Sequence, residues 1–220
     1  MGALRSFRDR VLGHPRVYLA VQRLLGADRL RRRCVDLLEP REGERILDVG
    51  CGVGYVLDYL PPISYYGFDT NRRYIEYARR RYAGRGHFYC EDLAPRHLEA
   101  LPPIDGALLM GLLHHVPDDV GHAIVDLVCR ALAPNGRMVT LDPCLEEHGS
   151  AVARYVAKSD RGAYVRDQPG YVALLSRRFT TTDAVLWRNT GRIPSTEIII
   201  RCSGPVPSGD AGAVRSGAQP

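Results

Sequence analysis

The stretch LDVGCGVG, residues 47–54, decides the fold, because glycines at 50, 52 and 54 follow a short apolar run. Glycine has no Cβ, so a loop built on it can reach positive φ and bring its backbone close to a ligand. A helix that begins just after such a loop offers unpaired N–H groups to an anion. The stretch therefore predicts a strand that ends in a ligand-binding turn, followed by a helix over 53–60.

Strand-like and helix-like patterns alternate on both sides of this turn. Near-continuous apolar runs predict strands over 44–50, 64–69, 87–92, 104–110 and 137–142, of the kind buried on both faces of a sheet. A hairpin-like pair of strands follows over 182–189 and 195–202. Helical spacing predicts helices over 70–84, 119–132, 151–159 and 169–178. The first of them starts at an Asn71 cap and stops at Gly84. This alternation is typical of a doubly wound α/β sheet.

The glycine spacing separates the nucleotide-binding families that share such a loop. A nicotinamide-dependent oxidoreductase would need G-x-G-x-x-G, with glycine at 55, whereas this chain has Tyr55. The loop instead resembles D-x-G-x-G-x-G, the first motif of class I S-adenosylmethionine-dependent methyltransferases. That resemblance implies a Rossmann-like, seven-stranded mixed sheet in three α/β/α layers, and cofactor contacts from Asp48, Gly50, Cys51, Gly52 and Gly54.

Three later segments match the same family, each at the end of a predicted strand, where open α/β sheets bind ligands. Asp69 resembles the acid that accepts the ribose hydroxyls, with Thr70 beside it. Asp92 resembles the acid that meets the adenine amino group, near the Leu93 backbone, although Glu91 could compete for that role. The segment 110–118, MGLLHHVPD, resembles the part of the family that lines the cofactor with Met110 and borders the acceptor.

His114 and His115 are the candidate general bases. Methyl transfer needs mainly positioning, and it needs a base only if the acceptor must lose a proton. An imidazole titrates near neutrality and suits a hydroxyl or an activated carbon. The sequence slightly favours His115, and a hydrogen-bonded pocket wall is the alternative for both. The N-methyltransferase motif NPPY is absent, which argues against amino groups of adenine or glutamine as acceptors.

Two segments outside the motifs are expected to border the active site. A helix over 14–26 places Tyr18 and Gln22 on one face, where they could contact the cofactor or the acceptor, although ordinary packing explains them as well. The segment 143–179 stands where the family builds a lid over the acceptor. Its polar or aromatic candidates are Tyr155, Tyr164, Arg166 and Tyr171.

The charge is unevenly distributed along the 220 residues. Nine arginines stand against two aspartates through Arg33, so this arm carries +7 and residues 34–220 carry −2 of the overall +5. A basic arm permits peripheral contact with an anionic membrane, whereas a nucleic-acid surface spread over the protein is not expected. We expect one domain over 1–202, with a helical cap at 1–40, and a disordered, Gly/Pro/Ser-rich tail at 203–220.

The cysteine pattern and the family resemblance indicate the cellular location and the function of the protein. The six cysteines form no CxxC pair, so neither a disulfide framework nor a metal site is predicted, and a cytoplasmic location is expected. The function expected from the resemblance is methyl transfer to the oxygen or carbon of a small organic acceptor, such as a quinone-like, polyketide, lipid or other natural-product molecule. An RNA methyltransferase and a non-catalytic, methyltransferase-like partner module are the alternatives left open.

Overall fold

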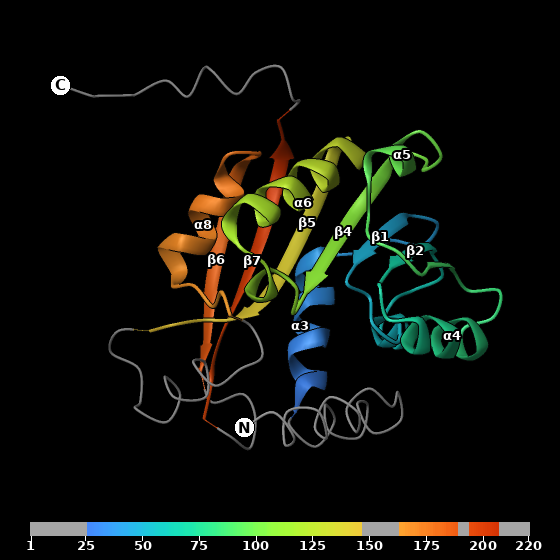
Figure 1. Cartoon of the computed structure of the whole chain (residues 1–220), viewed down its shortest axis with the longest axis horizontal. Helices are drawn as coiled ribbons and strands as arrows, with labels where there is room; N and C mark the ends of the chain where they lie inside the picture. The colour runs from blue at the N-terminus through green and yellow to red at the C-terminus, as the bar shows by residue number, and fades with distance from the viewer. Residues whose placement is uncertain (1–25, 147–162, 189–193, 207–220) are drawn as a thin grey trace.

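A computed structural model describes residues 26–146, 163–188 and 194–206 (Figure 1). The helices predicted over 14–26 and 151–159 lie outside or almost entirely outside these ranges. Most of the predicted cap over 1–40 and nearly all of the predicted tail also lie outside them.

One seven-stranded sheet forms the centre of the described chain, in the order β3-β2-β1-β4-β5-β7-β6. Its strands are β1 (Arg45–Val49), β2 (Ser64–Phe68), β3 (His87–Tyr89), β4 (Ile104–Met110), β5 (Leu132–Pro143), β6 (Phe179–Arg188) and β7 (Thr196–Pro205). Strands β1 to β5 pair in parallel, whereas β7 runs antiparallel to both β5 and β6. The predicted mixed sheet is therefore confirmed.

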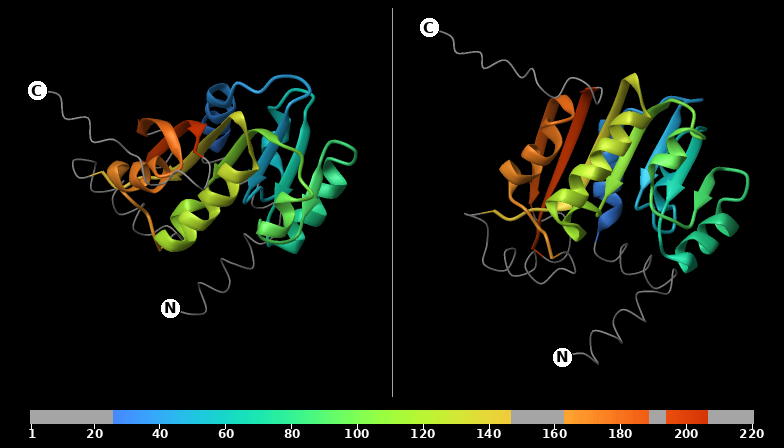
Figure 2. Two further views of the ribbon diagram at one scale, coloured as in Figure 1. Left: turned by 90° about the horizontal axis from the view of Figure 1, so that it is seen from above. Right: turned by 45° about the horizontal axis from the view of Figure 1, so that its top comes forward.

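Helices cover both faces of the sheet, as the two views of Figure 2 show. One face packs against α3 (Ala27–Leu38) and α4 (Arg72–Arg81), and the other against α5 (Pro95–Leu98), α6 (Asp118–Ala131) and α8 (Gln168–Ser176). Along β1, Ile46 joins the α3 and α4 core, whereas Leu47 joins the α6 and α8 core, because successive strand side chains point to opposite faces. Each buried aliphatic side chain of this kind stabilises the fold by about 1.5–3 kcal/mol. The three-layer α/β/α arrangement is confirmed.

The helix predicted over 53–60 is wrong in extent. The structure has only a 3-10 turn there, η1 (Tyr55–Asp58), with i→i+3 bonds from Leu57 N to Gly54 O and from Tyr59 N to Val56 O. Gly54 is left-handed at φ 70° and Pro61 follows soon after, so too few residues remain for an α-helix. The anion site expected at a helix N-terminus in this place is therefore absent from the described loop.

Other predicted boundaries shift by a few residues. Asn71 caps α4 as predicted, and its side chain accepts hydrogen bonds from the N–H groups of Arg73 and Tyr74 in the first turn. Strand β5 starts before the predicted 137–142, but 133–136 bulges out of the pairing between Ile104–Leu132 and Gly106–Arg137. Strand β7 continues to Pro205, beyond the predicted strand 195–202.

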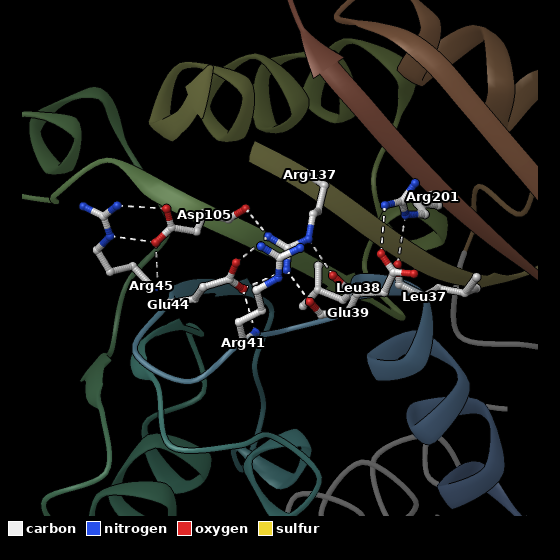
Figure 3. Close-up of polar contacts among 9 residues, drawn as sticks. All are labelled: Leu37, Leu38, Glu39, Arg41, Glu44, Arg45, Asp105, Arg137 and Arg201. Atoms are coloured by element: carbon white, nitrogen blue, oxygen red, sulfur yellow. Dashed lines mark hydrogen bonds and ion pairs between the residues drawn. The ribbon is translucent and has the colours of Figure 1, made fainter. Parts of the chain in front are cut away.

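The parallel strands start at an edge held together by arginines, which we call the amino edge (Figure 3). It consists of the end of α3 with residues 39–45, Asp105, Arg137 and Arg201. Arg137 uses all five of its N–H donors there. They reach the carbonyls of Leu38 (2.6 Å), Glu39 (2.7 Å) and Asp105 (2.9 Å) and the two carboxylate oxygens of Glu44 (3.1 and 2.7 Å).

Two further arginines complete this edge (Figure 3). Arg45 binds both carboxylate oxygens of Asp105, with Nε at 2.7 Å and Nη2 at 2.8 Å. Arg201 donates to the carbonyl of Leu37 at 3.0 Å. Cations at the last carbonyls of a helix stabilise it, so the amino edge ties α3 to the sheet.

Candidate active site

The opposite edge of the sheet gathers the predicted site residues. Because β1 to β5 are parallel, the segments that follow them lie together at the end toward which their arrows point (Figure 1). We call this the carboxyl edge, and it consists of residues 48–54, 69–71, 90–93, 110–118 and 142–146. It therefore brings the four predicted motifs into one region.

A different physical constraint explains why each position 50, 52 and 54 in the loop after β1 is glycine. All three are left-handed, at φ 77° for Gly50, 56° for Gly52 and 70° for Gly54. A Cβ at Gly50 would come within 3.3 Å of Leu112, and one at Gly54 within 3.0 Å of Phe88, so packing restricts both positions. A Cβ at Gly52 would meet nothing within 4 Å. Gly52 therefore leaves space beside its backbone that a ligand can occupy.

Asp69 supports this loop from the end of β2. Its Oδ2 accepts a hydrogen bond from Gly52 N at 2.9 Å, and its Oδ1 accepts one from Asn71 N at 2.7 Å. A carboxylate accepts about four hydrogen bonds, so both oxygens keep capacity for a ligand hydroxyl. Burial raises the pKa of Asp69, which these two N–H donors partly offset. The support of the glycine loop is a role that the sequence did not predict.

Asp48 is buried at the end of β1. The Tyr65 hydroxyl donates to its Oδ2 at 2.6 Å, but its Oδ1 is buried and has no hydrogen-bond partner in the described chain. Burial raises the pKa of Asp48 to about 7. An unpartnered buried oxygen is costly, and a cationic ligand at this edge would favour the ionised carboxylate.

The remaining predicted cofactor residues divide by exposure. Thr70 and Asp92 are exposed, Leu93 is buried, and Met110 is half-buried as the last residue of β4. Cys51 is buried with its sulfur toward the core, since a Cβ on Gly67 would lie 2.9 Å from it. The Cys51 side chain therefore faces away from the edge, and burial raises the pKa of its thiol. Only its backbone is left to meet a ligand.

The competition between Glu91 and Asp92 has a geometric answer. Glu91 pairs with Arg96 at 2.5 Å and lies 3.3 Å from His97 Nε2. The hydrogen bond from Arg96 lowers the pKa of Glu91. Asp92 is therefore the acid of this pair that is more readily available to a ligand.

His114 forms a buried pair with an acid that the sequence analysis missed. Its Nδ1 lies 2.7 Å from Asp142 Oδ1, and its backbone N–H donates to the same oxygen at 3.1 Å. Burial raises the pKa of Asp142, and the hydrogen bond from His114 opposes that shift. When Asp142 is ionised, its carboxylate only accepts, and this arrangement favours the proton on Nδ1 and the lone pair on Nε2 of His114. Asp142 ends the predicted strand 137–142, as Asp69 and Asp92 end theirs, and that signal could have found it.

His115 differs from its neighbour. It is exposed in the turn η2 (Leu113–His115), with its ring 3.9 Å from the His114 ring. The contact with the buried Asp142 carboxylate orients His114, and this favours His114 as the candidate base, whereas the sequence slightly favoured His115.

Of the three lid candidates among the described residues, Arg166 and Tyr171 are occupied by contacts within the protein. Arg166 spends its donors on the protein, and Tyr171 is fully buried with its hydroxyl donating to Pro143 O at 3.0 Å. Tyr164 is 43% exposed and keeps a free surface. Tyr18, Gln22 and Tyr155 lie outside the described residues.

A pocket of about 730 Å³ opens between the starts of α6 and α8. Its lining includes Asp118, His122, Leu174 and Arg177, but neither the glycine loop nor His114. Asp118 is already paired with Arg166. The pocket thus lies beside the candidate site without containing its chemistry.

Over the described ranges, none of the helices combines the length and apolar character needed to cross a bilayer.

Comparison with known proteins assigns this arrangement to a family. The family model described as a methyltransferase domain matches residues 20–170. The chain is 32% identical over 145 residues to O-methyltransferase cnsE of Penicillium expansum, covering 58% of this chain and 49% of that protein. It is 30% identical over 115 residues to the ubiquinone biosynthesis O-methyltransferase of Thiobacillus denitrificans, covering 49% and 47%. The chain thus spans about half the length of the curated relatives it matches.

A solved structure shares the fold. Human N-acetylserotonin methyltransferase in complex with S-adenosylmethionine has a TM-score of 0.63 and 19% identity, over 87% of this chain and 55% of that one.

Proposed function

The chain belongs to the methyltransferase domain family, and on that premise we propose that it methylates a hydroxyl group of a small organic acceptor, with His114 as the general base. The cofactor is S-adenosylmethionine, which supplies an electrophilic methyl group on a positively charged sulfur. The carboxyl edge fits that cofactor in three respects. Gly52 leaves open space beside its backbone, and the Asp69 carboxylate can accept further hydrogen bonds. The buried Oδ1 of Asp48 has no hydrogen-bond partner within the described residues.

We propose that the described cofactor contacts are the Gly50–Gly54 backbone, Asp48, Asp69 and Asp92, with Thr70, Leu93 and Met110 beside them. In this assignment Cys51 contributes its backbone only, since its side chain faces the core.

The His114–Asp142 pair carries the proposal. Asp142 holds Nδ1 protonated at 2.7 Å, so Nε2 is the nitrogen able to take a proton from an acceptor hydroxyl. The same carboxylate then stabilises the imidazolium that forms, as the acid of a catalytic triad does. Such a base is useful for a hydroxyl or an activated carbon and unnecessary for a nucleophile that holds a free lone pair. Both cited relatives are named as O-methyltransferases, which supports oxygen as the atom methylated.

The test incubates the protein with S-adenosylmethionine carrying a deuterated methyl group and a panel of phenols, catechols and hydroquinones. Mass spectrometry should find one labelled methyl group on at least one hydroxyl compound. His114→Gln should lower the rate by about 100-fold or more, the usual contribution of a general base. His115→Gln is the matched control, and its rate should stay near that of the wild type.

Four results would contradict parts of this proposal. Equal rates in both variants would refute the assignment of His114 as the general base. A larger loss of rate in His115→Gln would assign that role to His115 instead. Cofactor binding without methylation of any acceptor would favour a non-catalytic partner module. Salt-sensitive binding and methylation of RNA would favour the alternative acceptor suggested by the basic arm, most of which lies outside the described residues.

A further inference from the structure

Arg166 uses every donor of its guanidinium within the protein, and four of the five hydrogen bonds reach the segment that carries His114. Nη1 donates to the carbonyls of Leu113 at 2.7 Å and Tyr164 at 3.0 Å, and Nη2 donates to the carbonyl of Val116 at 2.9 Å. Nε and Nη2 both reach Asp118 Oδ1, at 2.8 and 2.6 Å. These five bonds account for the five N–H groups of an arginine, and the side chain is only 11% exposed.

The backbone around Arg166 is tied to the segment that carries Asp142. Leu145 N donates to the Arg166 carbonyl at 2.9 Å, and Cys144 forms a parallel β-bridge with Arg166. Residues 144 and 145 directly follow the end of β5, two and three positions after Asp142. The side chain of Arg166 therefore holds one half of the pair, and its backbone holds the other.

Two neighbours reinforce this link. Tyr164 N donates to the His114 carbonyl at 3.0 Å, which fixes the backbone of the histidine itself. The Arg166 guanidinium lies 5.7 Å from the ring centre of Tyr171, whose hydroxyl binds the carbonyl of Pro143, the residue after Asp142. Residues 164–171 thus contact both sides of the His114–Asp142 hydrogen bond.

We propose that Arg166 is a positioning residue, which holds the His114–Asp142 hydrogen bond and so keeps Nε2 as the unprotonated nitrogen. The proposal rests on the proposed role of His114 in catalysis. Arg166 itself has no donor left for a ligand and therefore acts only through the histidine. A small displacement of the turn 113–116 would lengthen the 2.7 Å contact and remove the preference for protonation at Nδ1.

The test is the tautomer of His114 in the full chain without any ligand. Long-range ¹H–¹⁵N spectra of ¹⁵N-histidine-labelled protein distinguish a protonated from an unprotonated ring nitrogen, and the His114→Gln variant identifies the signal. The wild type should show Nδ1 protonated and Nε2 unprotonated. Arg166→Lys should give averaged signals from both tautomers, because a lysine cannot reach all these acceptors together.

Arg137→Lys is the matched control, because Arg137 is 13% exposed and also uses five donors, but at the amino edge. It should keep the wild-type tautomer. Asp118→Asn provides a second variant that removes only one partner of Arg166 at an exposed position. It should shift the tautomer in the same direction by a smaller amount, so the proposal stays testable even if Arg166→Lys unfolds.

A folded Arg166→Lys protein with the wild-type tautomer would overturn the proposal, as would an equal change in Arg137→Lys. With an accepted substrate, Arg166→Lys should lower kcat about tenfold with little change in KM, because the base is misplaced while binding is kept. Failure of the proposed function is distinguishable from failure of this inference. If His114→Gln methylates at the wild-type rate while Arg166→Lys alters the tautomer, the histidine is not the base, yet Arg166 still positions it.

Discussion

The pKa values of the carboxyl groups shift in opposite directions at the two edges of the sheet. At the amino edge, hydrogen bonds from Arg45 lower the pKa of Asp105, and although burial acts to raise that of Glu44, hydrogen bonds from Arg137 lower it. At the carboxyl edge, burial raises the pKa values of Asp48, Asp69 and Asp142. Within the described residues, no arginine hydrogen-bonds to these three acids.

This difference separates stability from function. Paired charges at the amino edge fix α3 and the strand starts, whereas acids with raised pKa values and open acceptor capacity are the arrangement found at ligand sites. Two left-handed glycines that both face open space differ in the same way: the N–H of Gly52 donates to the Asp69 carboxylate, whereas that of Gly43 at the amino edge donates to the Pro62 carbonyl. Substitutions at the carboxyl edge should therefore change cofactor binding, and those at the amino edge should change the stability of the fold.

The largest effect is expected from Gly52→Val, which should abolish measurable S-adenosylmethionine binding in calorimetry. The valine side chain would occupy the space beside the loop backbone, while circular dichroism should stay near wild type. Gly43→Val is the control, because Gly43 is also left-handed, at φ 80°, and also faces open space. It should bind the cofactor normally. Retained binding in Gly52→Val would show that the loop does not hold the cofactor.

Arg137→Gln should lower the free energy of unfolding by about 2–4 kcal/mol, since it leaves Glu44 and several carbonyls without their donor. Denaturant unfolding measures this loss. Arg201→Gln, which breaks a longer and more exposed contact with Glu39, should cost less than about 1 kcal/mol. Both variants should keep cofactor affinity, and a weakened affinity at unchanged stability would contradict the separation of the edges.

Asp69→Ala should weaken S-adenosylmethionine binding by about 1.5–3 kcal/mol, the scale of hydrogen bonds that involve a charged group. Part of this loss comes from the glycine loop, because Gly52 N loses its acceptor. Asp105→Ala removes a paired acid at the amino edge and should reduce stability without changing affinity. Wild-type affinity in Asp69→Ala would refute the assignment of this acid.

The smallest expected effect is a pH dependence. Because the folded pKa of Asp48 is about 7, the stability contributed by its proton is complete below about pH 4 and is lost as the pH rises through 7. Asp48→Asn removes this loss, so from about pH 5 to about pH 8 its stability should rise relative to wild type by on the order of 1–2 kcal/mol. Urea unfolding at both pH values measures the difference. A parallel response of the two proteins would contradict the buried, unpartnered state of Asp48.

The amino edge has the opposite sign of pH dependence. The lowered pKa values of Glu44 and Asp105 give stability above the ordinary range of these carboxyls, and that stability is lost on acidification through their folded values.

The sequence predicted the sheet well, because the sheet depends on local patterns, and the cofactor contacts stay a prediction built on patterns of the same kind. The alternation of Ile46, Leu47 and Val49 and the cap at Asn71 are readable from neighbouring residues. The motif acids at 48, 69 and 92 lie at the ends of predicted strands, which are readable in the same way.

What the sequence did not predict depends on partners far apart in the chain. Arg166 contacts Leu113 across 53 residues, and Arg137 contacts Leu38 across 99, so no local pattern reveals these partners. The sequence offered Arg166 only as a contact of the acceptor. Asp142 had the strand-end signal but lacked a family motif to draw attention to it. The helix predicted over 53–60 failed because Gly54 and Pro61 limit it to a single turn.

Hydrogen exchange followed by mass spectrometry, with and without S-adenosylmethionine, tests the central claim most directly. The claim predicts slower exchange on cofactor addition in peptides that cover 48–54, 69–71, 90–93 and 110–118, while 39–45 and the start of β4 stay unchanged. Protection confined to the amino edge, or spread equally over both edges, would contradict the assignment of the carboxyl edge as the methyl-transfer site.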